Sequence, residues 1–267
     1  MRHLLLLPLL AIGLQAAPWS PATVASWNTN LLNGLVAYWQ LDEVDNGANP
    51  IDSWSTNNLV DVNTVNRGIG LLNNGLSSLQ TGERILSEIQ SPWTNNLNNF
   101  SVSVWVNMFT NPGTFFQILG CYKTDSECSF YLSISPHNTT NNSVRIAVST
   151  NKTHTGVLAI SIADTNRVIT QTGLWWHCVG TVGDRVTLYI NGEDKGSVAR
   201  NFNITPSNSK FQLYGRYETG DLKVMAKLDE VGFWRRELTA AEVLLLYNKT
   251  NPAEEAKGRR FPFNSGP

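Results

Sequence analysis

Aromatic side chains in expected loops and at expected strand ends are the residues of this sequence best suited to contact a ligand. Sugar sites combine an aromatic face with amides or carboxylates that fix hydroxyl groups. Tyr189, together with Trp105, lies on a strand face opposite the aliphatic residues. We predict five ligand-binding residues: Trp54, Trp93, Tyr122, Trp175 and Tyr189. The alternative is that each ring plugs an end of the fold or lies under a loop.

Residues for nucleophilic or metal-assisted hydrolysis do not occur in the patterns that such chemistry needs. Neither G-x-S-x-G nor H-E-x-x-H is present, so neither a serine nucleophile on a strand–helix turn nor a two-histidine zinc helix is indicated. The histidines form no constellation with nucleophiles or acids: His3, His137, His154 and His177. We expect His177 to be structural and the chain to have no enzymatic activity.

Cysteine spacing offers one candidate crosslink. Cys121 and Cys128 bracket the polar stretch Tyr-Lys-Thr-Asp-Ser-Glu, which is typical of a turn between two strands. In an exported protein a disulfide can close such a loop. Cys178 stands in an apolar strand, where we expect a buried thiol. No paired Cys/His spacing indicates zinc.

The first 16 residues have the pattern of a signal peptide. A short basic start precedes an apolar run over residues 4–14, and Ala16 offers a small residue at the cleavage point. The run is shorter than the roughly 20 apolar residues that span a bilayer, and no later stretch reaches that length. We therefore expect residues 1–16 to be removed and the mature chain to be secreted to the extracellular space, without membrane insertion.

The composition is poor in charge. Charged residues make up 15% of the chain and hydrophobic residues 42%, with a net charge of -1. An average soluble domain carries roughly 25% charged residues. The near-neutral balance gives no basic footprint for nucleic acid and no polybasic patch for a membrane surface.

Most periodic segments of the chain favour strands. Residues 100–107 alternate with period two, and Asn191-Gly192 is a strong hairpin signal. The only convincing helix covers residues 240–247, where Thr239 and Glu242 form a capping box. Many short strands with one late helix predict an all-β fold, a two-sheet antiparallel sandwich over residues 17–251. Residues 252–267 are expected to form a C-terminal tail.

Five segments of the chain form an ordered set of motifs. They are G-L-V-A-Y-W-Q-L-D-E at 34–43, D-S at 52–53, F-S-V-S-V-W-V at 100–106, W-H with L-Y-I-N-G at 176–192, and L-D-E-V-G-F-W with L-T and L-Y-N at 228–248. The set resembles the LamG-like domains of the concanavalin A-like lectin/glucanase superfamily over residues 34–250, and this resemblance implies a jelly-roll sandwich. The chain departs from the family near Gly75, where Leu76 stands and no "A-x-x-F" follows.

The glucanases of this superfamily provide a test for catalysis. Its retaining glucanases carry a strand with a pattern that resembles E-x-D-x-x-E. The two glutamate carboxyls, one the acid and the other the nucleophile, then face one groove roughly 5 Å apart. The nearest stretch here runs from Glu83 to Glu88 and lacks the central Asp. Five positions apart on a strand, these two carboxyls would face opposite sides. The sequence therefore favours a non-catalytic module.

The resemblance also implies one structural calcium ion. Sandwiches of this superfamily often hold Ca²⁺ where the first and last strands meet, and by position this indicates Asp42 or Glu43 with Asp229. Calcium takes 6–8 oxygen ligands and relieves repulsion between carboxylates. The alternative is that Asp229 accepts hydrogen bonds from turn amides or pairs with Arg235 or Arg236.

Two binding functions fit these observations. The first is a carbohydrate-binding or adhesion module that recognises an extracellular glycan. The second is a protein-interaction or structural module that binds a cell-surface protein or joins an extracellular assembly. The sequence does not indicate which glycan would be bound, nor an oligomeric state.

Overall fold

The computed structural model describes residues 29–78, 82–88, 97–109, 115–136, 142–153, 157–163, 172–215 and 225–250. The predicted signal peptide (residues 1–16), the C-terminal tail (residues 252–267) and Trp93 lie outside these ranges. Of the helices described, none is long and apolar enough to cross a membrane.

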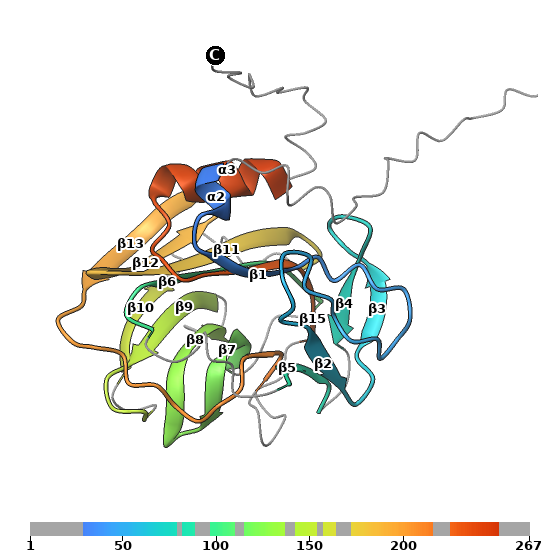
Figure 1. Cartoon of the computed structure of the whole chain (residues 1–267), viewed down its shortest axis with the longest axis horizontal. Helices are drawn as coiled ribbons and strands as arrows, with labels where there is room; N and C mark the ends of the chain where they lie inside the picture. The colour runs from blue at the N-terminus through green and yellow to red at the C-terminus, as the bar shows by residue number, and fades with distance from the viewer. Residues whose placement is uncertain are drawn as a thin grey trace, which may run out of the picture.

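Two antiparallel sheets form the described part of the chain (Figure 1). The eight-stranded sheet contains, in spatial order, β13 (Glu193–Ala199), β12 (Arg185–Ile190), β11 (Trp175–Val182), β6 (Phe100–Met108), β15 (Ala226–Trp234), β4 (Asn74–Ser78) and β3 (Asn66–Ile69), and β1 (Leu35–Trp39) also pairs with β15. The seven-stranded sheet contains β10 (Val157–Ala163), β9 (Asn142–Ser149), β8 (Glu127–Pro136), β7 (Phe116–Thr124), β14 (Gln212–Leu213), β5 (Arg84–Ser87) and β2 (Leu59–Val62). The predicted all-β sandwich is confirmed.

The main core lies between the two sheets. Side chains on a strand alternate between its faces, and alternate residues of β6 point inward as predicted. Phe100 packs there against Phe130 of β8 and Phe233 of β15, with ring centroids 4.6 and 5.8 Å away. The seven-stranded sheet contributes alternate residues in the same way, so its other face points away from this core.

A second core lies on the outer face of the eight-stranded sheet, beneath two helices, α2 (Thr29–Leu32) and α3 (Ala240–Thr250) (Figure 1). The predicted capping box starts α3, because the Thr239 N–H donates to Glu242 at 2.9 Å. Val243 and Leu246 of α3 then pack on the sheet. This helix runs three residues beyond the predicted end, and α2 was not predicted.

Strand β15 changes its partner partway along. Residues 226–228 pair with β4, whereas residues 231–234 pair with β1 along the same edge. An irregularity between Asp229 and Gly232 marks the change, and Glu230 has a φ of +50°. A non-glycine residue rarely adopts this left-handed conformation.

Candidate ligand-binding face

Five polar side chains stand on the face of the seven-stranded sheet that points away from the main core. We call this set the polar face; it comprises Gln117, Tyr131, Ser133, Arg145 and Gln212. Their sequence neighbours, such as Phe130, Leu132 and Ile146, belong to the core between the sheets. Because strand side chains alternate, the polar residues between them point to the opposite side.

The sheet register aligns three members of the polar face in a row. Gln117 of β7 stands opposite Ser133 of β8, and Ser133 stands opposite Arg145 of β9. In the neighbouring row, Gly120 stands between Gln212 and Tyr131. Directly opposed side chains lie within about 5.5 Å at their Cβ atoms, so the three polar groups of the first row can contact one ligand.

Several polar atoms of this face are buried without a hydrogen-bond partner in the structure. They are Gln117 Nε2 and Oε1, Ser133 Oγ, Arg145 Nε and Gln212 Oε1. The Nε2 group of Gln212 does donate, at 2.6 Å, to the backbone oxygen of Tyr122. An unpartnered buried polar group costs about 1–3 kcal/mol, so this concentration of such groups is unusual for a fold interior. Gln117, Ser133 and Gln212 are each 0% exposed, and only Arg145 is partly exposed.

Aromatic rings border the row on one side. The guanidinium carbon of Arg145 lies 5.6 Å from the centroid of the Tyr131 ring. Tyr122 stacks on Tyr131 with centroids 5.3 Å apart, and Phe115 meets it edge-on. Burial raises the pKa of the Tyr131 hydroxyl, so the phenol stays neutral at physiological pH. Arg145 is only partly buried, and the row therefore reaches solvent at this residue.

The structure does not gather the predicted aromatic residues at one site. Tyr122 contacts the polar face but is buried, and its hydroxyl donates to Asp125 Oδ1 at 2.5 Å. Trp54 is 37% exposed, and its indole N–H donates to the Leu35 oxygen at 3.0 Å. Trp175 is half-buried at the start of β11, on the other sheet.

Helix α3 lies over the two other aromatic residues that were considered for ligand binding, Tyr189 and Trp105. Tyr189 is buried in the second core beside Val243. Trp105 donates its indole N–H to Thr250 Oγ1 at 2.8 Å and stacks on Tyr247. Both rings therefore have a structural role, which was the alternative to ligand binding. Helix α3 covers the face of the sheet on which a ligand was expected.

His177 also has a structural environment, as expected. Its Nε2 atom lies 2.8 Å from Ser103 Oγ, and its ring packs 5.0 Å from that of Trp105. Full burial lowers its pKa to about 3, so the imidazole is neutral in the folded protein.

The three residues predicted to bind calcium all accept N–H hydrogen bonds. Asp229 Oδ2 accepts from the amides of Leu71 and Leu72 at 2.7 and 3.0 Å, as the alternative interpretation proposed. Asp42 Oδ1 accepts from the amide of Asn74 at 3.2 Å.

Glu43 accepts from the amide of Ile51 at 2.8 Å and lies 3.9 Å from Arg67 Nε. Across the described ranges, no group of three acidic, histidine or cysteine side chains is arranged to hold a metal ion. The three carboxylates thus have partners within the fold, and the calcium site stays a prediction.

The predicted disulfide is wrong, because the sheet holds the two thiols apart. Cys121 stands opposite Phe130 and points into the main core, whereas Cys128 stands opposite Tyr122 and packs on the other face. No disulfide joins them. Cys178 is buried as expected, and burial raises its pKa to about 12.

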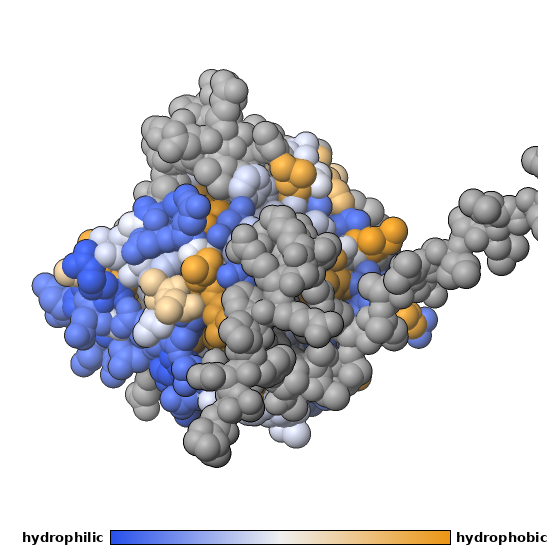
Figure 2. Space-filling model, turned by 90° about the horizontal axis from the view of Figure 1, so that it is seen from above, coloured by the Kyte–Doolittle hydropathy of each residue, from blue (hydrophilic) through white to orange (hydrophobic). Residues whose placement is uncertain are grey.

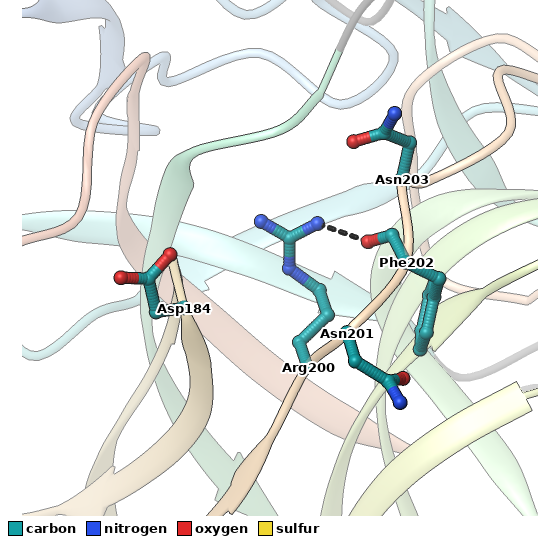
Figure 3. A pocket seen from close by; sticks show the side chains of 5 residues that line it. All are labelled: Asp184, Arg200, Asn201, Phe202 and Asn203. Atoms are coloured by element: carbon teal, nitrogen blue, oxygen red, sulfur yellow. Dashed lines mark hydrogen bonds between the residues drawn. The ribbon is translucent and has the colours of Figure 1, made fainter.

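A cavity of about 270 Å³ lies at the end of β13, lined by Asp184, Arg200, Asn201, Phe202 and Asn203 (Figure 3). The guanidinium of Arg200 donates to the backbone oxygens of Gly183 and Asn98, both at 2.7 Å, and to that of Phe202. Its donors are thus used by the fold, and the polar face remains the stronger candidate site.

The polar face was missed in the sequence because its members are separated by up to 95 positions, from Gln117 to Gln212. The usable signal was a single arginine within the apolar strand Val-Arg-Ile-Ala-Val at 144–148. A charged side chain on the strand face opposite the core residues needs a polar or charged group to interact with. Only the strand register shows which residues stand beside it.

A family model described as the concanavalin A-like lectin/glucanases superfamily matches residues 85–244. Sequence comparison with curated proteins finds no match.

Solved structures share the fold at low identity. The "Botulinum Neurotoxin Type G Receptor Binding Domain" aligns with a TM-score of 0.61 and 18% identity, over 81% of this chain and 51% of that one. Domain 4 of AbnA, an extracellular arabinanase from Geobacillus stearothermophilus in complex with arabinotriose, aligns with a TM-score of 0.58 and 19% identity, over 80% and 98%. The Trypanosoma rangeli sialidase in complex with sialic acid aligns with a TM-score of 0.60 and 16% identity, over 80% and 32%. The chain thus spans about half the length of the neurotoxin domain that it matches.

Proposed function

The chain belongs to the concanavalin A-like lectin/glucanase superfamily, and from this premise we propose that it is a secreted, non-catalytic module that binds an extracellular glycan on the polar face. The observation that carries the proposal is the row formed by Gln117, Ser133 and Arg145, with its unpartnered polar atoms.

The chemistry of these atoms favours a sugar. Gln117 Nε2 and Arg145 Nε are donors, whereas Gln117 Oε1 and Gln212 Oε1 are acceptors. A bare anion would satisfy only the donors. A sugar presents several hydroxyl groups, each of which donates and accepts, beside C–H faces that pack on an aromatic ring such as Tyr131.

Catalysis has little support from the same face. Glycoside hydrolysis needs two carboxyl groups flanking one bond, roughly 5 to 9.5 Å apart. None of the five residues of the polar face is acidic. Glu83 is buried and accepts from Ser78 at 3.1 Å, whereas Glu88 is exposed. The two glutamates nearest to the glucanase pattern therefore do not share an environment.

The proposal is tested by a glycan array probed with residues 17–267, in calcium and again in EDTA. We expect binding that persists in EDTA, because Asp42 and Asp229 already accept N–H groups. Loss of binding in EDTA would instead support calcium at these carboxylates. No binding by a folded protein under either condition would overturn the glycan proposal and favour the protein-interaction module.

A substitution locates the site. We expect Gln117→Met to weaken glycan binding about thirtyfold, because two hydrogen bonds of about 1 kcal/mol each are lost. The same change should leave the melting temperature equal or higher, since methionine removes two unpartnered polar atoms from a buried position.

Thr181→Val is the matched control, because Thr181 is likewise a buried polar residue but stands on β11 of the other sheet. It should leave glycan affinity unchanged. If Gln117→Met binds as tightly as the original chain, the site lies elsewhere.

Export is proposed from residues 1–16 alone. Expression of the full chain in a secreting host, followed by N-terminal sequencing of the protein in the medium, should give Ala17 as the first residue. Retention of the protein inside the cells would contradict export.

A further inference from the structure

We propose that the glycan bound by the polar face is acidic, and that Arg145 recognises its carboxylate or sulfate group. This inference rests on the proposed function and adds the ligand's chemical class.

The surroundings of Arg145 leave its charge uncompensated. Register places Ser133 and Ser161 directly opposite it on the two neighbouring strands. The residues two positions away along β9 are equally neutral, as is the diagonal neighbour on β8; these are Ser143, Ala147 and Tyr131. No described carboxylate forms an ion pair with Arg145.

Other arginines of the fold are used differently. Arg236 donates two hydrogen bonds of 2.8 Å to the carboxylate of Glu242. Arg200 donates to three backbone oxygens. Arg67 and Arg84 have a buried Nε without a partner, but each donates from Nη1 to a backbone oxygen. Arg145 also has an unpartnered Nε, and its guanidinium contacts the ring of Tyr131. A partly desolvated guanidinium with free donors is a specific receptor for an anion.

Guanidinium geometry defines the complementary group. Two parallel N–H bonds match the two oxygens of a carboxylate, or two oxygens of a sulfate, and such charge-assisted bonds are roughly twice as strong as neutral ones. Gln117 and Gln212 also have unpartnered acceptor oxygens, but both side chains are 0% exposed. Arg145 is partly exposed, so its guanidinium is the group of the polar face that defines the ligand: a sugar with an anionic substituent.

The pH dependence follows from the same groups. Arginine does not titrate in the accessible range, and a sugar carboxylate is ionised above about pH 5. The raised pKa of Tyr131 keeps its phenol neutral. Binding should therefore be constant between pH 5.5 and 8 and should weaken with added salt, by less than a fully exposed ion pair would.

The test is an array of matched glycan pairs followed by calorimetry. The pairs are uronic-acid oligosaccharides against their methyl esters, sialylated against desialylated glycans, and sulfated against unsulfated glycans. We expect the acidic member of at least one pair to bind about tenfold tighter. The first two pairs identify a carboxylate and the third a sulfate.

Arg145→Gln should reduce that preference to about one while binding of the neutral member persists, and Arg145→Lys should keep part of it. Arg185→Gln is the matched control, since it removes one positive charge from an exposed position on the other sheet. It should leave the preference unchanged, and circular dichroism and melting temperature establish that each variant is folded.

The outcomes separate this inference from the proposed function. Equal binding of acidic and neutral members, lost in Gln117→Met, would overturn the acidic ligand and keep the glycan site. An acidic preference that survives Arg145→Gln would overturn the role of Arg145. Absence of binding by the folded original chain would overturn both proposals.

Discussion

At the scale of single residues, Glu230 has an unusual environment for a carboxyl group. It is buried, accepts a hydrogen bond from the Tyr38 hydroxyl on one oxygen, and has no partner for the other. Burial first and the charge of Asp42 next raise its pKa to about 8, despite the opposing hydrogen bond. Asp229 beside it also has a raised pKa, chiefly through burial. The pair thus favours protonation in the folded state.

This environment predicts a stability that declines with rising pH. The folded pKa of Glu230 lies above its ordinary value of 4.5, so the folded state binds the proton more tightly than the unfolded state does. The resulting stabilisation is fully present below pH 4.5 and is lost as pH rises through about 8. We expect the melting temperature to fall between pH 6 and 9, measured by calorimetry in buffers of constant ionic strength.

Glu230→Gln should flatten that decline, because glutamine cannot ionise. Glu242→Gln serves as the control: its carboxylate has a lowered pKa in the folded state, so its removal should lower the melting temperature without removing the decline. A melting temperature of the original chain that is constant from pH 6 to 9 would contradict this account.

His177 predicts the opposite slope on the acid side. Its folded pKa of about 3 lies below its ordinary 6.5, so the unfolded state binds the proton more tightly. Stability present above pH 6.5 should therefore be lost progressively as pH falls toward 3. His177→Gln should lessen the loss of melting temperature between pH 6 and 4, and an unchanged acid profile in this variant would show that other groups govern it.

At the scale of elements, the sequence predicted those features that depend only on residues close together in the chain. The capping box of α3 and the hairpin at Asn191-Gly192 follow from adjacent side chains, and the structure has both, with φ of 52° and 81° at the two hairpin residues. Helix α2 has only four residues and no periodicity to detect. The candidate site depended on register between distant strands, and Tyr189 was misjudged because no local pattern shows that α3 packs over it.

Helix α3 should contribute substantially to stability through its buried side. Leu246 is 1% exposed and lies in the second core, whereas Leu244 on the same helix is 47% exposed. We expect Leu246→Ala to lower the free energy of unfolding by about 2–5 kcal/mol. Leu244→Ala should change it by about 0.5 kcal/mol or less, as measured by urea denaturation. Equal effects of the two variants would mean that α3 does not pack as described.

At the scale of the whole molecule, two packed sheets and a covering helix hold the fold without a crosslink. Cys121 and Cys178 lie in the main core, whereas Cys128 lies on the opposite face of its sheet. Burial raises the pKa of Cys128 to about 12, so its reactive thiolate is scarce at neutral pH. On the face seen in Figure 2, the described residues form separate apolar areas among hydrophilic ones.

We therefore expect reductant to leave the melting temperature unchanged. A thiol-specific reagent at pH 8 should react slowly with the folded protein and should titrate three thiols after unfolding without reductant. A titration of one thiol under those conditions would show that Cys121 and Cys128 are joined after all.

The partner change along β15 also has a consequence for the order in which the chain can fold during synthesis. Strands near residues 35 and 75 both pair with residues 226–234, and β6 pairs with the other edge of the same segment. These early strands leave the ribosome about 150 residues or more before the partner that they share. The eight-stranded sheet therefore cannot close until residues 226–234 have been made, and pairing across such long separations is slow. A sheet that stays open until then leaves the preceding strands in a state that an export machinery could thread through a membrane before they fold.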